Sequence, residues 1–181
     1  MIDKTDTAPD RKFILKDSTE IRIRNAVKDD LVSINDIYNY YVINSTCTWQ
    51  TNPEKMEERL AWFDEHNEDY PVIAAESEGV IVGWAAISRF REREGYKPTV
   101  ENSVYVRHDC LFSGIGAVLL KEIIRIARAG GYHSMIAGIS ADQKASIVLH
   151  EKHGFTKAAH LKEAGRKFDT WLDVAYYQLL L

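Results

Sequence analysis

Hydrophobic and polar residues alternate in several short segments of the chain, and this alternation predicts β-strands. The pattern is clearest in Ile21-Arg22-Ile23-Arg24, which we interpret as the first strand of the domain. Residues 71–76 and 80–88 predict two further strands, and Ser77-Glu78-Gly79 between them is short enough for a hairpin turn. Strands are also expected over residues 101–107, 135–139, 155–161 and 171–180.

Apolar residues spaced three or four positions apart predict helices between these strands. Asp29 or Asp30 is expected to cap a first helix, whose apolar stripe runs from Leu31 to Val42. A second helix is expected to start at Asn52-Pro53-Glu54, where a capping residue, a proline and an acidic residue follow one another. Its predicted buried face consists of Met56, Leu60 and Phe63.

Glycines delimit the two later helices. One helix follows the Gly114-Ile115-Gly116 turn and is expected to stop at Gly130-Gly131. Asp142 is expected to cap the last helix, which runs to about His153 and ends at Gly154.

A chain of 181 residues suffices for one domain with a sizeable core. The order of strands and helices predicts an α/β (α+β) domain over residues 21–181, with a mixed sheet. Residues 1–20 are expected to form a flexible N-terminal extension. Phe13-Ile14-Leu15 is the only apolar patch of that extension, and it is able to dock either on the domain or on a partner.

Composition and charge exclude several classes of function. A net charge of −4 argues against nucleic acid as the main partner, because phosphate contacts need a basic surface. No apolar run approaches the roughly 20 residues that cross a membrane, and the first residues lack the apolar core of a signal peptide. Cys47 and Cys110 form no C-x-x-C pair, so we expect two free thiols and a cytoplasmic protein.

The turn Ser113-Gly114-Ile115-Gly116 is a candidate phosphate site. A strand-like run precedes it and an amphipathic helix follows, so free backbone N–H groups at the helix start can bind a phosphate or diphosphate. Position 119 is Leu, where a dinucleotide-binding loop needs its third glycine, and the Gly-Lys-Ser/Thr of a Walker loop is missing. Tight packing alone is the alternative reading of this G-x-G turn.

Two titratable side chains are candidates for proton transfer. Glu101 shares one strand face with Ser103 and Tyr105 beside the predicted phosphate site, and it is a candidate general base or an exposed strand-end acid. His150 can exchange a proton near neutral pH. Its spacing from His153 does not match a known metal motif and no third ligand suggests itself, so no metal site is predicted.

Residues 89–97 form a basic loop that also contains aromatic rings. Arginine binds a carboxylate through two parallel hydrogen bonds, so this loop predicts either an anion site or a solvated charged segment. Its cations and rings are Arg89, Arg91, Arg93 and Lys97 with Phe90 and Tyr96.

Taken together, these segments resemble the GCN5-related N-acetyltransferase family, and within it the phosphinothricin and methionine sulfoximine/sulfone acetyltransferases. The resemblance covers about residues 21–180 and rests most on T-x-E-x-S-V-Y-V at 99–106 and L-H-E-x-x-G-F at 149–155. It implies that family's fold, with a mostly antiparallel central sheet flanked by about four helices. Further matching segments are Ile37-Tyr38-Asn39, Tyr70-Pro71-Val72, Lys167-Phe168 and Trp171-Leu172-Asp173.

The resemblance implies acetyl-CoA as the acyl donor and no metal. In the family the pantetheine runs along the strand at Val104 and Val106, and the diphosphate binds the loop that matches Leu111–Gly116. The side chains of residues 111–113 depart from the polar and basic residues usual there, and Gln143 stands where the family has Asn. The implied CoA-binding residues are Val104, Tyr105, Val106, Leu111, Phe112, Ser113, Gly114, Ile115, Gly116, Gln143 and Ser146.

The same resemblance implies roles for the titratable groups. Glu101 matches the general base, which an amine needs because it is largely protonated at pH 7. His150 stands where many relatives have a Tyr that protonates the departing thiolate. The implied acceptor is a small amino-acid-like amine, with two copies of the chain forming a homodimer. Its implied contacts are Arg91, Arg93, Tyr96, Thr99, Trp49 and Phe168.

Two alternatives remain at the level of sequence. A protein or peptide acetyltransferase would use the basic loop to bind an acidic peptide. A degenerate acyl-CoA-binding module is the other, suggested by Leu111, Phe112 and Gln143 at positions where the family has polar or basic side chains.

Overall fold

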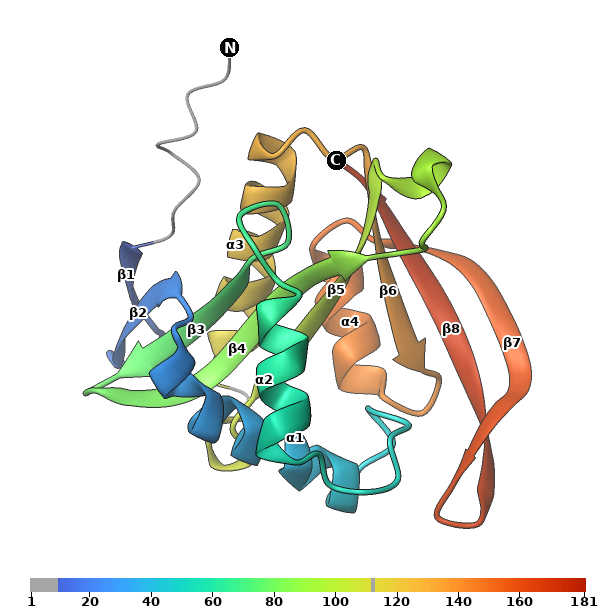
Figure 1. Ribbon diagram of the computed structural model, residues 1–181, viewed down its shortest axis with the longest axis horizontal. Helices are drawn as coiled ribbons and strands as arrows, with labels where there is room; N and C mark the ends of the chain where they lie inside the picture. Colours follow the sequence, from blue (N-terminus) through green and yellow to red (C-terminus); the bar gives the residue numbers. More distant parts are fainter. Residues whose placement is uncertain (1–9, 112) are drawn as a thin grey trace.

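Eight strands form one sheet in the order β1-β2-β3-β4-β5-β6-β8-β7 in the computed structural model, which describes residues 10–111 and 113–181 (Figure 1). Neighbouring strands are antiparallel except β5 and β6, which are parallel, so the predicted mixed, mostly antiparallel sheet is confirmed. The strands are β1 (Asp10–Ile14), β2 (Glu20–Asn25), β3 (Val72–Ser77), β4 (Val80–Arg89), β5 (Thr99–Val106), β6 (Ser134–Ser140), β7 (Thr156–Lys167) and β8 (Thr170–Leu180).

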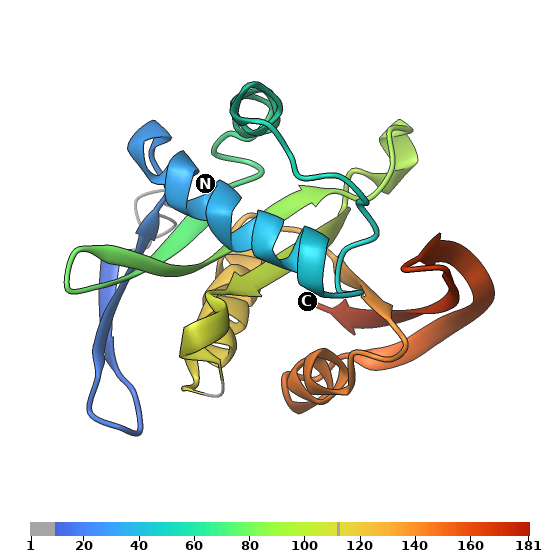
Figure 2. The ribbon, with the colours of Figure 1, turned by 90° about the horizontal axis from the view of Figure 1, so that it is seen from below.

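Helices cover both faces of the sheet (Figure 2). One apolar core lies between the sheet and α3, and a second lies between the sheet and α1. Alternate residues of β3 and β4 point into the two cores, as the period of two in a strand requires. No helix among residues 10–111 and 113–181 is long and apolar enough to cross a membrane. The α-helices are α1 (Leu31–Asn44), α2 (Met56–Asp64), α3 (Ile115–Ala129) and α4 (Lys144–Lys152), and the short 3-10 helices are η2 (Lys28–Asp30), η3 (Glu94–Tyr96) and η4 (His108–Cys110).

The N-terminal segment differs from the flexible extension expected over residues 1–20. Residues 10–14 form β1, which pairs with β2 in an antiparallel hairpin. Leu15 is only 7% exposed and belongs to the core under α3, with Phe13 half-buried beside it. The apolar patch therefore docks on the domain, because its alternating side chains reach an existing core.

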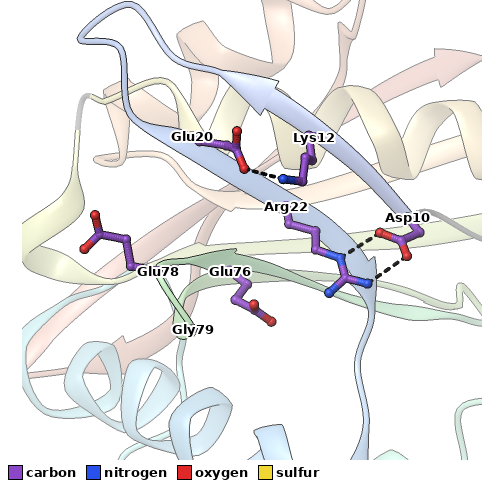
Figure 3. Close-up of a pocket in the computed structure, with 7 residues that line it drawn as sticks. All are labelled: Asp10, Lys12, Glu20, Arg22, Glu76, Glu78 and Gly79. Atoms are coloured by element: carbon purple, nitrogen blue, oxygen red, sulfur yellow. Dashed lines mark hydrogen bonds and ion pairs between the residues drawn. The ribbon is translucent and has the colours of Figure 1, made fainter.

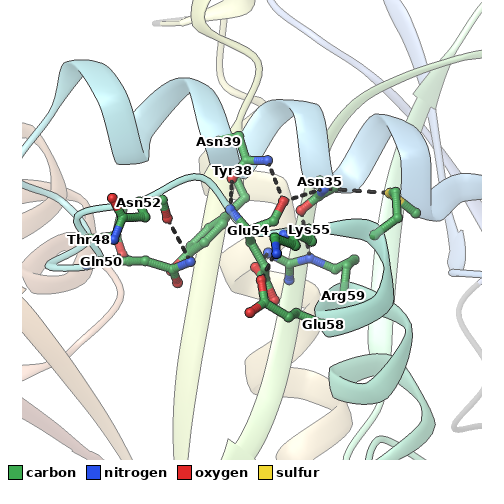
Figure 4. Close-up of polar contacts among 11 residues, drawn as sticks. Asn35, Tyr38, Asn39, Thr48, Gln50, Asn52, Glu54, Lys55, Glu58 and Arg59 are labelled. Carbon is green, nitrogen blue, oxygen red and sulfur yellow. Dashed lines mark hydrogen bonds and ion pairs between the residues drawn. The ribbon is translucent and has the colours of Figure 1, made fainter.

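The second helix starts later than the sequence suggested, and one of the three residues predicted for its buried face, Leu60, is exposed instead. The side-chain oxygen of Asn39 accepts a hydrogen bond from the backbone N–H of Glu54 at 2.7 Å, and its amide nitrogen donates to the Glu54 carbonyl at 2.9 Å (Figure 4). These two bonds hold the segment around Glu54 outside the helix. Arg59 is 2% exposed, whereas Leu60 is 37% exposed. The Arg59 guanidinium is buried because it pairs with Glu54 and lies 4.6 Å from the centre of the Tyr38 ring.

Local turn signals were more reliable. Glu78 and Gly79 both have positive φ, and they close the predicted hairpin between β3 and β4. Gly131 and Gly154 have φ of 78° and 90° and follow the ends of α3 and α4, as the glycine pattern predicted. The cap of α4 is Gln143 rather than Asp142.

Candidate active site

β5 and β6 pair over only three residues and then separate. The last pair is Glu101 with Ile136, although both strands continue. The N–H of Arg107 bonds to a carbonyl of β4, so alternation turns the N–H and C=O groups of Val104 and Val106 toward the gap. Within the described part of the chain, the carbonyl of Val106 is the one group among these that has a partner, the Tyr41 hydroxyl at 2.5 Å. The rest of this strand edge can hydrogen-bond an extended ligand.

Asn102 occupies the point where the two strands part. Its Nδ2 donates to the carbonyl of Ile136 at 3.2 Å, and its Oδ1 lies 3.1 Å from Nε2 of His150. The side chain therefore joins β5 to both β6 and α4 where the backbone ladder ends. Asn102 was not among the predicted site residues, but a polar residue on the apolar strand face of Val100 and Val104 was a usable signal.

His150 lies beside Asn102 on the α3 and α4 side of the sheet and is 4% exposed. Its Nδ1 is 2.8 Å from the carbonyl of Ser146. Both ring nitrogens thus face oxygen acceptors, which favours a protonated ring. Burial acts against that charge and lowers the pKa of His150 below its usual value. A proton on this ring is consequently easy to release.

Glu101 lies on the opposite face of β5, with Ser103 and Tyr105. Burial raises the pKa of its carboxyl group, while the positive charge of Arg91 opposes that rise. A Cβ atom at Gly138 of β6 would lie 3.2 Å from Oε1 of Glu101. The glycine leaves room for this carboxylate beside the gap.

A small cavity of about 10 Å³ lies on the basic loop, and one of the residues that line it, Arg91, is close enough for its charge to act on Glu101. Arg91, Tyr96 and Thr99, three of the six predicted acceptor contacts, line it together with Tyr70, Arg89, Glu92 and Lys97. The loop therefore concentrates positive charge within reach of the candidate base.

The other three predicted acceptor contacts lie elsewhere. Arg93 precedes η3 and does not line this cavity. Trp49 packs against Gly165 of β7, where an added Cβ would overlap its ring. Phe168 is exposed in the turn between β7 and β8, which lies at the opposite end of the sheet from η3 in Figure 1.

The predicted phosphate turn forms the start of α3. Gly114 has φ of 102° and precedes the helix, and no side chain caps this end. Ser113 instead donates its hydroxyl to the carbonyl of Cys110 at 2.6 Å. The carbonyl of Gly114 accepts from the N–H groups of Ala117 and Val118, whereas those of Ile115 and Gly116 have no acceptor among residues 10–111 and 113–181 and can bind an anion. Leu111 is exposed, and Phe112 lies outside the described residues.

Gly116 lies where β5, α3 and α4 approach one another. A Cβ at this position would be 3.5 Å from Val106 and 3.6 Å from Leu149. The free strand edge and the free helix N–H groups are thus neighbours, which suits a ligand with an extended arm and a diphosphate. Acetyl-CoA has this shape, so the residues present fit it.

The loop after α1 is tied to α4 and to β7. Gln143 donates to the hydroxyl of Thr46 at 2.7 Å, and Ser146 belongs to the same helix. The buried Lys167 ammonium donates to the carbonyls of Ser45 and Thr48, each at 2.7 Å. Burial lowers the pKa of Lys167. These hydrogen bonds fix the position of the loop after α1 relative to the β7–β8 hairpin and α4.

A larger depression of about 500 Å³ lies on the N-terminal strands, away from the gap (Figure 3). Its charges pair with each other: Lys12 bonds Glu20 at 2.7 Å, and Arg22 bonds Asp10 at 2.7 Å. It contains none of the candidate catalytic groups. In the part of the chain that the structure describes, no group of three or more His, Cys, Asp or Glu side chains is placed to hold a metal.

Comparison with known proteins matches residues 23–175 to the family described as "Acetyltransferase (GNAT) domain". An L-methionine sulfoximine/L-methionine sulfone acetyltransferase from Pseudomonas paraeruginosa is 41% identical, over 88% of this chain and 94% of that protein. A phosphinothricin acetyltransferase from Sinorhizobium meliloti, solved in complex with AcCoA, is 36% identical, with a TM-score of 0.86 over 89% of this chain and 88% of that one. A ribosomal-protein-alanine N-acetyltransferase from Brucella melitensis is 41% identical, with a TM-score of 0.86 over 88% of this chain and 99% of that one.

Proposed function

The chain belongs to the GNAT acetyltransferase family and is an acetyl-CoA-dependent N-acetyltransferase; we propose that its acceptor is the amine of a small amino-acid-like molecule. The observation that carries the proposal is the position of Glu101, half-buried where β5 and β6 part and close enough to the basic loop for the charge of Arg91 to act on it. Relatives named for methionine sulfoximine, methionine sulfone and phosphinothricin indicate the acceptor class.

Glu101 serves as the general base in this proposal. The acceptor amine is protonated at pH 7 and attacks only after losing a proton, which the carboxylate takes directly or through one water. The raised pKa of Glu101 brings its basicity closer to that of the amine, which assists the transfer. A bond forms between the amine nitrogen and the acetyl carbon, and the carbon–sulfur bond breaks.

His150 is proposed to return a proton to the departing thiolate. Its lowered pKa makes the protonated ring a stronger acid than free imidazole, and Asn102 links the ring to the gap. An ordinary thiol has a pKa near 8.5, so the thiolate of CoA is a good leaving group and needs only modest help from an acid. The contribution of His150 is therefore expected to be smaller than that of Glu101.

The positive charge near Glu101 is proposed to hold the carboxylate of the acceptor. Arg91 provides a planar guanidinium that can bind a carboxylate with two hydrogen bonds. Tyr96 and Thr99 lie on the same loop and would contact the rest of the molecule from outside the cavity, which at about 10 Å³ is no larger than a water molecule. Binding there places the neighbouring amine on the face of β5 that carries Glu101.

The test is acetyl-CoA turnover against a panel of amines, followed by release of the free thiol. Methionine sulfoximine, methionine sulfone, phosphinothricin and plain L-amino acids form one half of the panel. Turnover of one or more of them, lost in the Glu101→Gln variant, is the expected result. Calorimetry that finds CoA bound while no amine in the panel is acetylated would contradict the proposed acceptor class.

A second candidate acceptor is the N-terminus of a protein or peptide, as in the ribosomal-protein-alanine N-acetyltransferase to which the chain is similar. The exposed basic residues of the loop, Arg93 among them, would then face acidic peptide. Peptides with Ala, Ser or acidic N-termini form the other half of the panel. Acetylation of these peptides, and of no free amino acid, would replace the small-molecule proposal.

We also propose that two copies of the chain form a homodimer in the cytoplasm. The β7–β8 hairpin exposes the apolar side chains of Leu161, Phe168 and Trp171, which a second copy would cover. Cys47 and Cys110 are free thiols, which suits a reducing compartment. Light scattering coupled to size exclusion tests the dimer, and a monomeric mass at micromolar concentration would contradict it.

A further inference from the structure

The β1–β2 hairpin begins before the segment that defines the family. The family model starts at residue 23, within β2, so β1 and the turn after it lie outside the match. The hairpin nevertheless packs on α3. Arg11 of β1 bonds Glu122 of α3 at 2.8 Å, and the Glu122 side chain is only 1% exposed.

The turn of this hairpin lies against the start of α3. Leu15, the first residue after β1, places its Cδ2 3.8 Å from the position that a Cβ would take at Gly114. Figures 1 and 2 agree in showing the β1–β2 turn beside the first turn of α3. Leu15 is buried there with Ile115 in one core, so the contact is fixed by packing. The turn itself is closed by a hydrogen bond from Ser18 N–H to the carbonyl of Leu15 at 3.0 Å.

Among the residues that the structure describes, those that lead into α3 provide no unpaired positive charge, whereas the β1–β2 turn beside them does. Residues 111–113 bring no cation, and Arg107 just before them is paired with Asp109 at 2.7 Å. Lys16 follows Leu15 directly, is exposed, and makes no ion pair among the described residues. Consecutive Cα atoms are about 3.8 Å apart, so the backbone of Lys16 lies one residue away from the contact that Leu15 makes at Gly114. Asp17 beside it is occupied by the backbone N–H of Thr19 at 3.1 Å.

We propose that the β1–β2 turn forms one wall of the CoA phosphate site and that Lys16 supplies the cation that residues 111–113 lack. This rests on the proposed binding of the CoA diphosphate at the start of α3. The backbone N–H groups of Ile115 and Gly116 would bind phosphate oxygens, while Lys16 neutralises their charge from the side. The hairpin would thereby compensate for the departure at positions 111–113.

The test is calorimetric titration of the full chain with CoA in the Lys16→Gln and Lys16→Glu variants. Loss of one exposed ionic contact is expected to weaken CoA binding about fivefold in Lys16→Gln, and charge reversal should weaken it further. Raising the salt concentration should weaken the wild type more than Lys16→Gln, because salt screens the contact that the variant lacks. The value of kcat at saturating acetyl-CoA should not change.

Lys12→Gln is the matched control. Lys12 lies on the same hairpin, but its ammonium is paired with Glu20 at 2.7 Å and faces the depression of Figure 3. Titration with 3′-dephospho-CoA identifies the phosphate involved. A fivefold effect that persists with this ligand assigns Lys16 to the diphosphate, and one that disappears assigns it to the 3′-phosphate.

Equal CoA affinity in the wild type and both Lys16 variants would overturn the proposal, as would equal weakening by Lys12→Gln. Thermal unfolding of each variant verifies that the hairpin is intact. Binding of CoA without acetylation of any amine would contradict the proposed acceptor and leave the Lys16 result standing. A wild-type chain that fails to bind CoA at millimolar concentration would contradict both.

Discussion

The two faces of β5 carry different chemistry, although they alternate along eight residues of one strand. Glu101 and Tyr105 point toward the side of α1 and α2, where the basic loop lies. Asn102, Val104 and Val106 belong to the side of α3 and α4, where the free helix N–H groups lie. The proposed base and the basic loop occupy one face, and a polar contact to a buried histidine occupies the other.

In the proposed reaction, groups on both faces act together, which requires an opening in the sheet. A continuous ladder between β5 and β6 would separate the two faces, because its backbone groups would be bonded to each other. The ladder instead stops at Glu101 and Ile136, next to Gly138. Donor and acceptor can then enter from opposite faces and meet at the gap.

Removing the base on the acceptor face should have the largest effect. We expect Glu101→Gln to lower kcat about 10²- to 10⁴-fold at pH 8, with CoA affinity unchanged. Its raised folded-state pKa means that the charged carboxylate costs stability at pH values above that pKa. The variant should therefore unfold at a slightly higher temperature at pH 8. More than a tenth of wild-type kcat in the variant would rule out Glu101 as the essential base.

Filling the gap from β6 should have the next largest effect. A side chain at Gly138 would meet Oε1 of Glu101 at 3.2 Å and the ring of Tyr176 at 3.4 Å. Gly138→Val is expected to lower kcat/KM about ten- to hundredfold by displacing the carboxylate, with Gly138→Ala showing a smaller loss. Unchanged kcat/KM in a folded Gly138→Val variant would mean that reaction does not occur beside this glycine.

Changing the histidine on the donor face distinguishes an acid from a positioning residue. His150→Asn is expected to reduce kcat about tenfold near pH 7, the low end for an acid whose leaving group needs little help. An acid must be protonated, so wild-type kcat should fall as pH rises through the lowered pKa of His150. This decline should be absent from the variant. A reduction by the same factor at every pH would indicate that His150 only positions Asn102.

Removing charge from the acceptor cavity should have the smallest effect. Arg91→Gln is expected to raise the acceptor KM about fivefold, because one ionic contact with a carboxylate is lost. The positive charge of Arg91 lowers the pKa of Glu101, so its removal should move the acid limb of kcat/KM to higher pH. Arg93→Gln is the matched control, since Arg93 does not line the cavity. Equal effects of both variants would place acceptor binding elsewhere on the loop.

Local spacing was enough to predict much of the fold. The β3–β4 hairpin, the glycine ends of α3 and α4, and the face shared by Glu101 and Tyr105 depend on residues within a few positions of each other. The start of α2 was missed because Asn39, fifteen positions before Glu54, holds that segment extended. Such a contact leaves no periodic signal in the sequence.

The candidate site was predicted less completely. Arg91, Tyr96 and Thr99 line one cavity because they lie within nine residues of each other on one loop, and their role in acceptor binding stays a prediction. Trp49 and Phe168 were assigned to the same pocket, yet the structure holds them beside β7 and in the β7–β8 turn. Nothing in the sequence around Trp49 and Phe168 indicates the distance between the β7–β8 hairpin and the basic loop.

The sequence by itself determined which groups the strand and the turn present: a carboxylate on one face of β5, apolar residues on the other, and free N–H groups at a glycine-led helix start. Only the tertiary structure decided that β5 and β6 part after Glu101, that Asn102 meets His150, and that the N-terminal hairpin reaches Gly114. The physical reason is the distance along the chain over which each kind of interaction acts. Periodicity and turn chemistry act over a few residues, whereas each of these contacts joins segments that only folding brings together.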